Sequence, residues 1–146
     1  MRCIELNREG NFDRWDHSKL MELRAIKNNV DAGNKYTIYQ NENMRLSVFV
    51  LESYQRLPFT IVENDFSLIS LTGGLAITRF SHGGISLLMF RKGEYVNHVL
   101  NNTRMVNDFQ NIGEGVMIMA VMEYRQKGIH GANPINFSKQ EPVFVP

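Results

Sequence analysis

Apolar residues recur along this chain in short runs, many of them with every second position apolar. In residues 44–54, Met44, Leu46, Val48 and Val50 share one face of an extended segment, and Arg45, Ser47, Phe49 and Leu51 share the other. Alternation of this kind is typical of a β-strand. Runs rich in β-branched, aromatic or alternating residues predict further strands. These strands are expected at 36–40, 66–71, 75–80, 85–90, 94–100 and 115–124.

The connections between these runs contain the residues that turns require. Thr72-Gly73-Gly74 joins two of the predicted strands, and the four residues 81–84 (SHGG) join the next two, as a hairpin would. The last run, 115–124, is apolar on both of its faces. A strand with this composition is expected at the centre of a sheet, covered on both sides.

The N-terminal segment fits two local structures. Trp15, Leu20 and Leu23 follow helical spacing, with Asp16 as a candidate N-cap. Met21, Leu23 and Ala25, however, alternate with charged residues, which is typical of a strand. We favour a short turn followed by a strand, with one short helix as the alternative.

Seven or more short strands with at most one short helix predict an all-β jelly roll or barrel, which hides its strand edges by closure or double-sheet packing. The length of 146 residues fits a single domain, spanning residues 1–146. Residues 125–146 turn polar and contain several glycines and prolines, so we expect an extended C-terminal tail.

The bulk composition excludes several classes of function. Sixteen Lys and Arg against fifteen Asp and Glu give a formal net charge of +1, without a basic run, so no nucleic-acid partner is expected. No apolar stretch approaches the roughly 20 residues of a membrane span. Charges interrupt the N-terminus, which lacks the apolar segment of a signal peptide, and Cys3 is the single cysteine. We therefore expect a cytoplasmic protein without a membrane partner.

The order of these segments resembles the cupin superfamily, whose members fold as a double-stranded β-helix of the RmlC-like type. Residues 66–99 repeat the cupin rhythm of strand, Gly turn, strand, Gly hairpin and strand, followed by a Lys-Gly-Glu turn. Residues 44–74 are similar to the accessory cupin of bacterial histidine-utilisation operons. Residues 93–96 and 104–125 resemble the C-terminal half of the cupins that act as sugar-nucleotide 3,4-ketoisomerases. The positions that match this second group are Gly93, Tyr95, Val96, Met105, Asp108, Phe109 and Tyr124.

The sequence departs from this family at the positions that hold its metal. Cupin metal sites usually take a His-x-His pair and a Glu from the first motif, with one more His from the second. Residues 36–60 contain no histidine, and Thr103 and Arg104 stand where the ketoisomerases have a Trp-His pair. The resemblance therefore implies a cupin without a bound metal or other cofactor, and a homodimer formed through strand edges.

His98 is the candidate for chemistry. It shares a strand face with Val96 and Leu100, which we expect to point inward. A metal site needs three or four donors, and the other histidines lie in distant segments, His82 in a hairpin turn where we expect it to be solvated. His98 is therefore predicted to be a buried, hydrogen-bonded residue, a hydrogen-bonding group in a pocket, or an acid or base.

Two charged residues are further candidates for a ligand pocket. Arg79 shares a face with Leu75 and Ile77, and Glu52 shares one with Val48 and Val50. If these faces point inward, Arg79 and Glu52 join His98 in a polar cluster within an apolar barrel, as in many small-ligand pockets. If they lie at strand ends, they are solvated, and this alternative is favoured. Tyr36, Tyr39 and Tyr95 are candidates for the barrel mouth.

Three functions follow from these observations. The first is a metal-free binding protein for a small polar ligand, such as a sugar, a nucleotide or a small acid, using His98, Arg79, Glu52, Tyr36 and Tyr95. The second is an isomerase or lyase related to the sugar-nucleotide cupins, with His98 as acid or base. The third is a structural or protein-interaction module.

Overall fold

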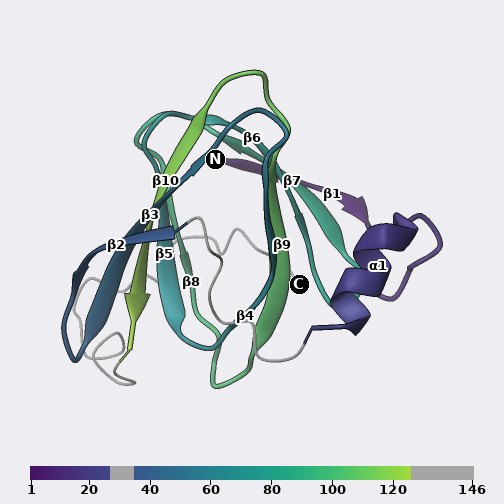
Figure 1. Ribbon diagram of the computed structural model, residues 1–146, viewed down its shortest axis with the longest axis horizontal. Coiled ribbons are helices and arrows are strands. Elements are labelled where there is room, and N and C mark those ends of the chain that lie inside the picture. The colour runs from purple at the N-terminus through teal and green to yellow at the C-terminus, as the bar shows by residue number, and fades with distance from the viewer. Residues whose placement is uncertain (27–34, 126–146) are drawn as a thin grey trace.

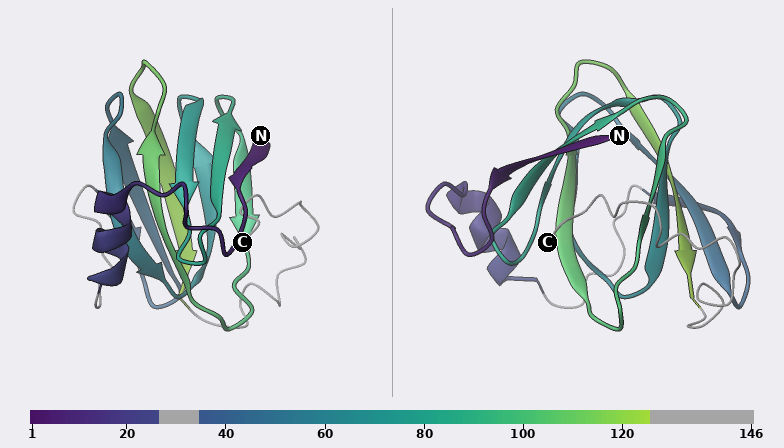
Figure 2. Two further views of the ribbon diagram at one scale, coloured as in Figure 1. Left: turned by 90° about the vertical axis from the view of Figure 1, so that its right-hand side faces the viewer. Right: turned by 180° about the vertical axis from the view of Figure 1, so that it is seen from behind.

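The computed structural model describes residues 1–26 and 35–125, which form two antiparallel five-stranded sheets packed face to face (Figure 1). Sheet A contains, in spatial order, β1 (Arg2–Asn7), β7 (Ile85–Phe90), β6 (Gly74–Arg79), β9 (Met105–Asn111) and β4 (Arg56–Val62). Sheet B contains β2 (Lys35–Gln40), β3 (Met44–Leu51), β10 (Met117–Tyr124), β5 (Asp65–Ser70) and β8 (Tyr95–His98). The right-hand view in Figure 2 shows the two sheets on either side of a common interior.

The core lies between the inner faces of the two sheets. Strand β10 is central in sheet B, paired with β3 on one side and β5 on the other, as its apolar composition predicts. Its inward residues Met117, Met119 and Val121 are buried. Leu51, Leu88 and Phe80 complete the packing and are among the most fully buried side chains.

The strands predicted from residue 36 onwards are confirmed, with small differences at their ends. The strands β1, β4 and β9 are additional. In β4, Pro58 interrupts the run, and the pairing with β9 shifts register between Leu57 and Thr60. A proline within a run argues against a regular strand, but a register irregularity at an edge accommodates it.

The N-terminal segment forms a helix, α1 (His17–Arg24), so the favoured prediction of a strand is wrong and its alternative is right. The carboxylate of Asp16 accepts hydrogen bonds from the backbone N–H and the hydroxyl of Ser18, and this N-cap starts the helix. The α1 helix lies outside sheet A (Figure 2). Trp15 anchors the segment: its Nε1 donates to the carbonyl of Gly83 at 2.8 Å, and its ring stacks on Phe59.

The predicted C-terminal tail lies outside the described residues, except for its first residue, Arg125, whose N–H donates to the carbonyl of Asn43 at 2.7 Å. The organisation of residues 1–146 as one domain with a tail stays a prediction.

Candidate functional site

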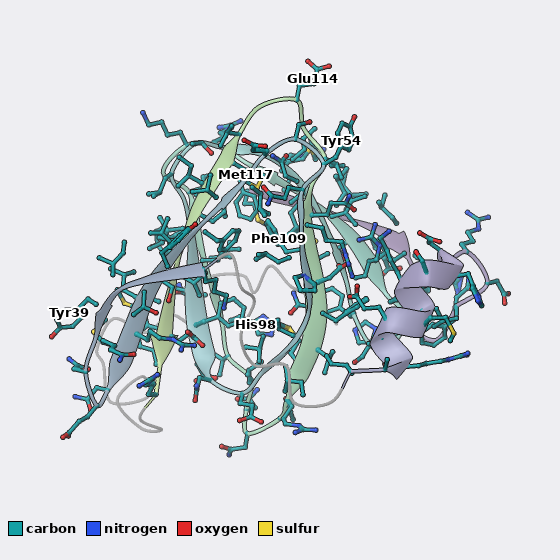
Figure 3. The ribbon with its side chains drawn as sticks, viewed as in Figure 1. Tyr39, Tyr54, His98, Phe109, Glu114 and Met117 are labelled. Carbon is teal, nitrogen blue, oxygen red and sulfur yellow. The ribbon has the colours of Figure 1, made fainter. Side chains whose placement is uncertain are left out.

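A cavity of about 80 Å³ opens between the inner faces of the two sheets, and we call it the mouth cavity. Three phenylalanines form much of its apolar surface: Phe49 from β3, Phe66 from β5 and Phe109 from β9. Figure 3 shows Phe109 pointing between the sheets, with Tyr54 and Glu114 at the far end of the barrel. The other described residues of the lining are Lys35, Leu57, Pro58, Thr60, Ile61, Val62, Leu68, Asn107, Asp108, Val121 and Glu123.

The register shift in β4 places Thr60 at this cavity. Leu57 and Val62, five positions apart, both pack against the core, which regular alternation would not allow. Thr60 pairs with Asn107, whose side-chain amide donates to the hydroxyl of Thr78 at 3.1 Å. The irregular edge strand thus supplies polar groups to an otherwise apolar wall.

Two of the acidic residues that line the cavity are neutralised by arginines. Nε of Arg45 donates to the carboxylate of Glu123 at 2.7 Å, and both side chains are largely buried. Asp108 is paired with Arg56 and Arg79 at 2.6 and 2.8 Å. Lys35 is a third charged residue of the lining, and the described part of the chain offers it neither an ion pair nor a hydrogen bond from its side chain.

Asp108 is the centre of a charged cluster on the side of sheet A that faces α1. The Asp108 side chain is fully buried, and it also accepts a hydrogen bond from the backbone N–H of Arg79 at 2.8 Å. Arg56 continues the cluster to α1 by a bidentate pair with Glu22 at 2.9 and 2.6 Å. Burial opposes the positive charge of Arg56, but its hydrogen bonds to Glu22 and Asp108 outweigh this effect and raise its pKa. The cluster fixes α1 to the barrel.

His98 points inward, as predicted, and is buried together with Val96 and Leu100. Its ring stacks on Phe66, with ring centroids 5.4 Å apart, and Figure 3 shows it between the two sheets. Burial lowers the pKa of His98 below its ordinary value of 6.5, while the Asp65 carboxylate partly offsets this effect. His98 is therefore neutral near pH 7. It contacts Phe66, which forms part of the cavity wall.

The stability of the protein should depend on pH through His98. Since the pKa of His98 is lower in the folded than in the unfolded chain, the unfolded chain binds the proton more readily. The contribution of neutral, buried His98 to the free energy of unfolding is present in full above pH 6.5. It is lost as the pH falls through the pKa that His98 has in the folded chain. We expect urea titrations between pH 7.5 and about pH 5 to show a flatter pH dependence for His98→Gln than for the wild type. His17→Gln, at an exposed position, should keep the wild-type slope; equal slopes for all three proteins would contradict this account.

The other predicted ligand-binding residues do not meet at the mouth cavity. Arg79 lies on the outer face of β6, because Ala76, Thr78 and Phe80 occupy the inner one, so its inward placement is wrong. It is not solvated at a strand end either, since it pairs with Asp108. Glu52 is exposed in the turn after β3, as the favoured alternative predicts.

The tyrosines lie away from the cavity as well. Tyr36 and Tyr95 are 67% and 45% exposed, and Tyr39 projects away from the barrel (Figure 3). None of them is among the described residues that line the mouth cavity. Their roles in ligand binding stay predictions, and the structure gives them no common position.

The donor atoms of the described residues do not fit the metal site that cupins usually carry. Among them, no group of three or more His, Cys, Asp or Glu side chains is placed to hold a metal ion. The carboxylates of Glu123 and Asp108 are already bound to arginines, and His98 has no second histidine beside it in its strand. His82 is not a solvated turn residue as predicted: it stacks on Phe80, and its Nδ1 accepts from the N–H of Gly84.

Comparisons with known proteins agree with this architecture. A cupin domain from Bordetella pertussis superimposes with a TM-score of 0.57 at 11% identity, covering 70% of this chain and 100% of that one. An RmlC-like cupin from Methanocaldococcus jannaschii reaches 0.51 at 16% identity, covering 67% and 86% of the two chains. The cupin domain of Cnp3 from Schizosaccharomyces pombe also reaches 0.51, at 12% identity, covering 84% and 88%.

The chain has the cupin fold. At these identities the likeness concerns the double-stranded β-helix alone. No family model matches the sequence, and no curated protein matches it significantly. In the described part of the chain, no helix is long and apolar enough to cross a membrane.

Sequence reasoning missed the polar residues of the mouth cavity. Lys35, Thr60, Asn107 and Glu123 come from four different strands and share no motif. For Thr60 one signal exists: it follows Pro58 within an apolar run, where a proline indicates an edge strand or an irregular register. Such a position can bring a polar side chain into a barrel.

Proposed function

We propose that this protein is a binding module that holds a small ligand in the mouth cavity. The observation that carries the proposal is an apolar cavity, walled by Phe49, Phe66 and Phe109, with a few polar groups at its side. Cavities of this composition are the usual form of small-molecule sites. Leu51, Met117 and Met119 fill the opposite end of the barrel. The mouth cavity is therefore the space that a ligand can occupy.

Binding is favoured over isomerisation because the candidate acid or base is poorly placed. His98 is not among the described residues that line the cavity, and its ring packs on Phe66, which does line it. A general acid or base has to come within hydrogen-bond reach of the reacting group. A sugar-nucleotide isomerase or lyase using His98, and kinship with the histidine-utilisation cupins, remain predictions from the resemblance.

A fragment screen by NMR tests the proposal. The full chain, labelled with ¹⁵N, is mixed with pools of small acids, amides, sugars and nucleosides, and amide shifts are followed. We expect hits that move the signals of Thr60, Asn107 and Phe109 without moving those of the far end, such as Glu114. A screen in which no compound moves the cavity signals, or in which every hit maps elsewhere, would overturn the proposal.

We further propose that two copies associate along β2. This strand is an edge of sheet B as described, and Tyr36, Ile38 and Tyr39 are more than half exposed along it. Natural edge strands are protected by charges, prolines or bulges; β2 has a register shift between Thr37 and Tyr39, but these three exposed positions carry neither a charge nor a proline. An edge of this kind favours pairing with an identical strand.

Light scattering after gel filtration measures this association. We expect the mass of a dimer for the wild type and a shift to monomer for Ile38→Lys, which places a charge in the contact. Met21→Lys changes an exposed apolar residue of α1 and should leave the dimer intact. A wild-type monomer at about 100 μM, well above common dimer affinities, would contradict the proposal. A cytoplasmic location and the absence of a nucleic-acid partner stay predictions.

A further inference from the structure

Within residues 1–26 and 35–125, one charged side chain of the mouth cavity takes part in no ion pair. Glu123 is matched by Arg45, and Asp108 by Arg56 and Arg79. Lys35 is the lining charge that no described residue opposes. A carboxylate bound to arginine has little remaining attraction for a cation, whereas an ammonium group beside an apolar wall attracts an anion strongly.

The position of Lys35 suits contact with a ligand. It begins β2 and pairs with Phe49 of β3, whose ring is part of the cavity wall. Lys35 lines the cavity and is half-buried, and a lysine in such a position usually covers apolar surface with its stem and keeps its ammonium group in water. An anionic group at the opening would meet Lys35 while the rest of the molecule enters the space among the phenylalanines.

The volume of the cavity limits the part of the ligand that enters it. A single enclosed water needs about 10–15 Å³ on the same measure, so the cavity of about 80 Å³ has room for about five to eight water molecules. A group of about five to eight non-hydrogen atoms fits such a space. Apolar side chains dominate the wall, so this group is expected to be a short hydrocarbon.

We propose that the mouth cavity binds a small monoanionic carboxylate with a short, branched or linear apolar body, and that Lys35 binds the carboxylate. This inference rests on the proposed function, since it names the ligand class of the same cavity. Thr60 and Asn107 provide hydroxyl and amide groups on the facing wall, and the side chains of Phe49, Phe109 and Val121 contact the apolar body.

Matched isosteres test the inference. The probes are 3-methylbutanoate, its neutral amide 3-methylbutanamide, and the cation 3-methylbutylammonium, titrated into ¹⁵N-labelled full chain. For the wild type we expect the acid to bind about ten- to one-hundred-fold more tightly than the amide, the value of one charge-assisted hydrogen bond. The ammonium compound should bind most weakly. Raising the salt concentration should weaken binding of the acid more than binding of the amide.

Variants at Lys35 separate its charge from the cavity itself. Lys35→Gln should lose the preference for the acid while binding the amide as the wild type does, and Lys35→Arg should restore it. Lys92→Gln removes an exposed lysine away from the described lining and should change nothing.

Each contrary result points to a different failure. If acid and amide bind the wild type equally, or if Lys35→Gln keeps the preference, the inference about the anion is overturned and the mouth cavity still stands as a ligand site. A preference for the ammonium compound would overturn it too, and would indicate that the carboxylate of Glu123 or Asp108 attracts the ligand. If no probe moves the cavity signals, the inference is wrong for this ligand class, and the fragment screen decides the proposed function independently.

Discussion

Replacing Asp108 by Asn is expected to lower the free energy of unfolding by about 3–5 kcal/mol, the range measured when one partner of a buried ion pair is removed. The Asp108 side chain is fully buried and holds two arginines, whose side chains are only 17% and 14% exposed. An amide in its place removes the carboxylate that Arg56 and Arg79 share, and among the described residues only Arg56 keeps another, that of Glu22. Urea denaturation followed by circular dichroism measures the difference.

A matched control comes from the surface pair of Glu63 and Arg104. Their charged groups are 3.6 Å apart, with side chains 52% and 64% exposed. Pairs of this kind contribute about 0–1 kcal/mol, so Glu63→Gln should have little effect. An Asp108→Asn variant as stable as Glu63→Gln would show that the cluster does not stabilise the fold. Asp108 is one of the positions on which the predicted resemblance to the sugar-nucleotide ketoisomerases rests, and its contacts in the structure are ion pairs with Arg56 and Arg79.

Replacing Thr60 by Trp is expected to weaken binding of any mouth-cavity ligand at least about one-hundred-fold, which corresponds to contacts worth about 3 kcal/mol. Thr60 lies on the edge strand β4, where a larger side chain can occupy the cavity without displacing the core packed at the other end. The measurement is an NMR titration with the best compound from the fragment screen.

The control for Thr60→Trp is the same substitution at Val116, which is exposed near the opposite end of the barrel. Val116→Trp should bind the compound with wild-type affinity. Thermal unfolding of both variants shows whether each remains folded. Undiminished binding by a folded Thr60→Trp variant would place the ligand outside the mouth cavity.

The strands were largely predictable from the sequence, but their inward faces were not. Both faces of β6 carry apolar side chains: Leu75 and Ile77 on one, Ala76 and Phe80 on the other. Periodicity shows that such a segment is a strand, but it cannot decide which face is buried when both are apolar. The larger aliphatic pair, Leu75 and Ile77, left an inward Arg79 open beside the favoured solvated position, and the structure shows neither, since Arg79 pairs with Asp108 on the outer face.

The mouth cavity depends on contacts between segments far apart in the chain. Lys35 begins β2, while Thr60 and Glu123 lie near the ends of β4 and β10, and all three line the cavity. A single sequence contains no signal that these strand ends lie close together. The inward direction of His98 was predicted correctly because His98 shares a strand face with the apolar residues Val96 and Leu100, which are also buried. The helix α1 was the weaker of two local interpretations, and the Asp16 cap decided for it.

The most direct test of a ligand in the mouth cavity is a crystal structure of the full chain with the tightest-binding compound of the screen. We predict that the apolar part of the compound lies against Phe49, Phe109 and Val121 and that its carboxylate lies within hydrogen-bonding distance of Lys35. A compound bound on the outside of the barrel, or phenylalanine side chains filling the space while the compound is elsewhere, would contradict the account.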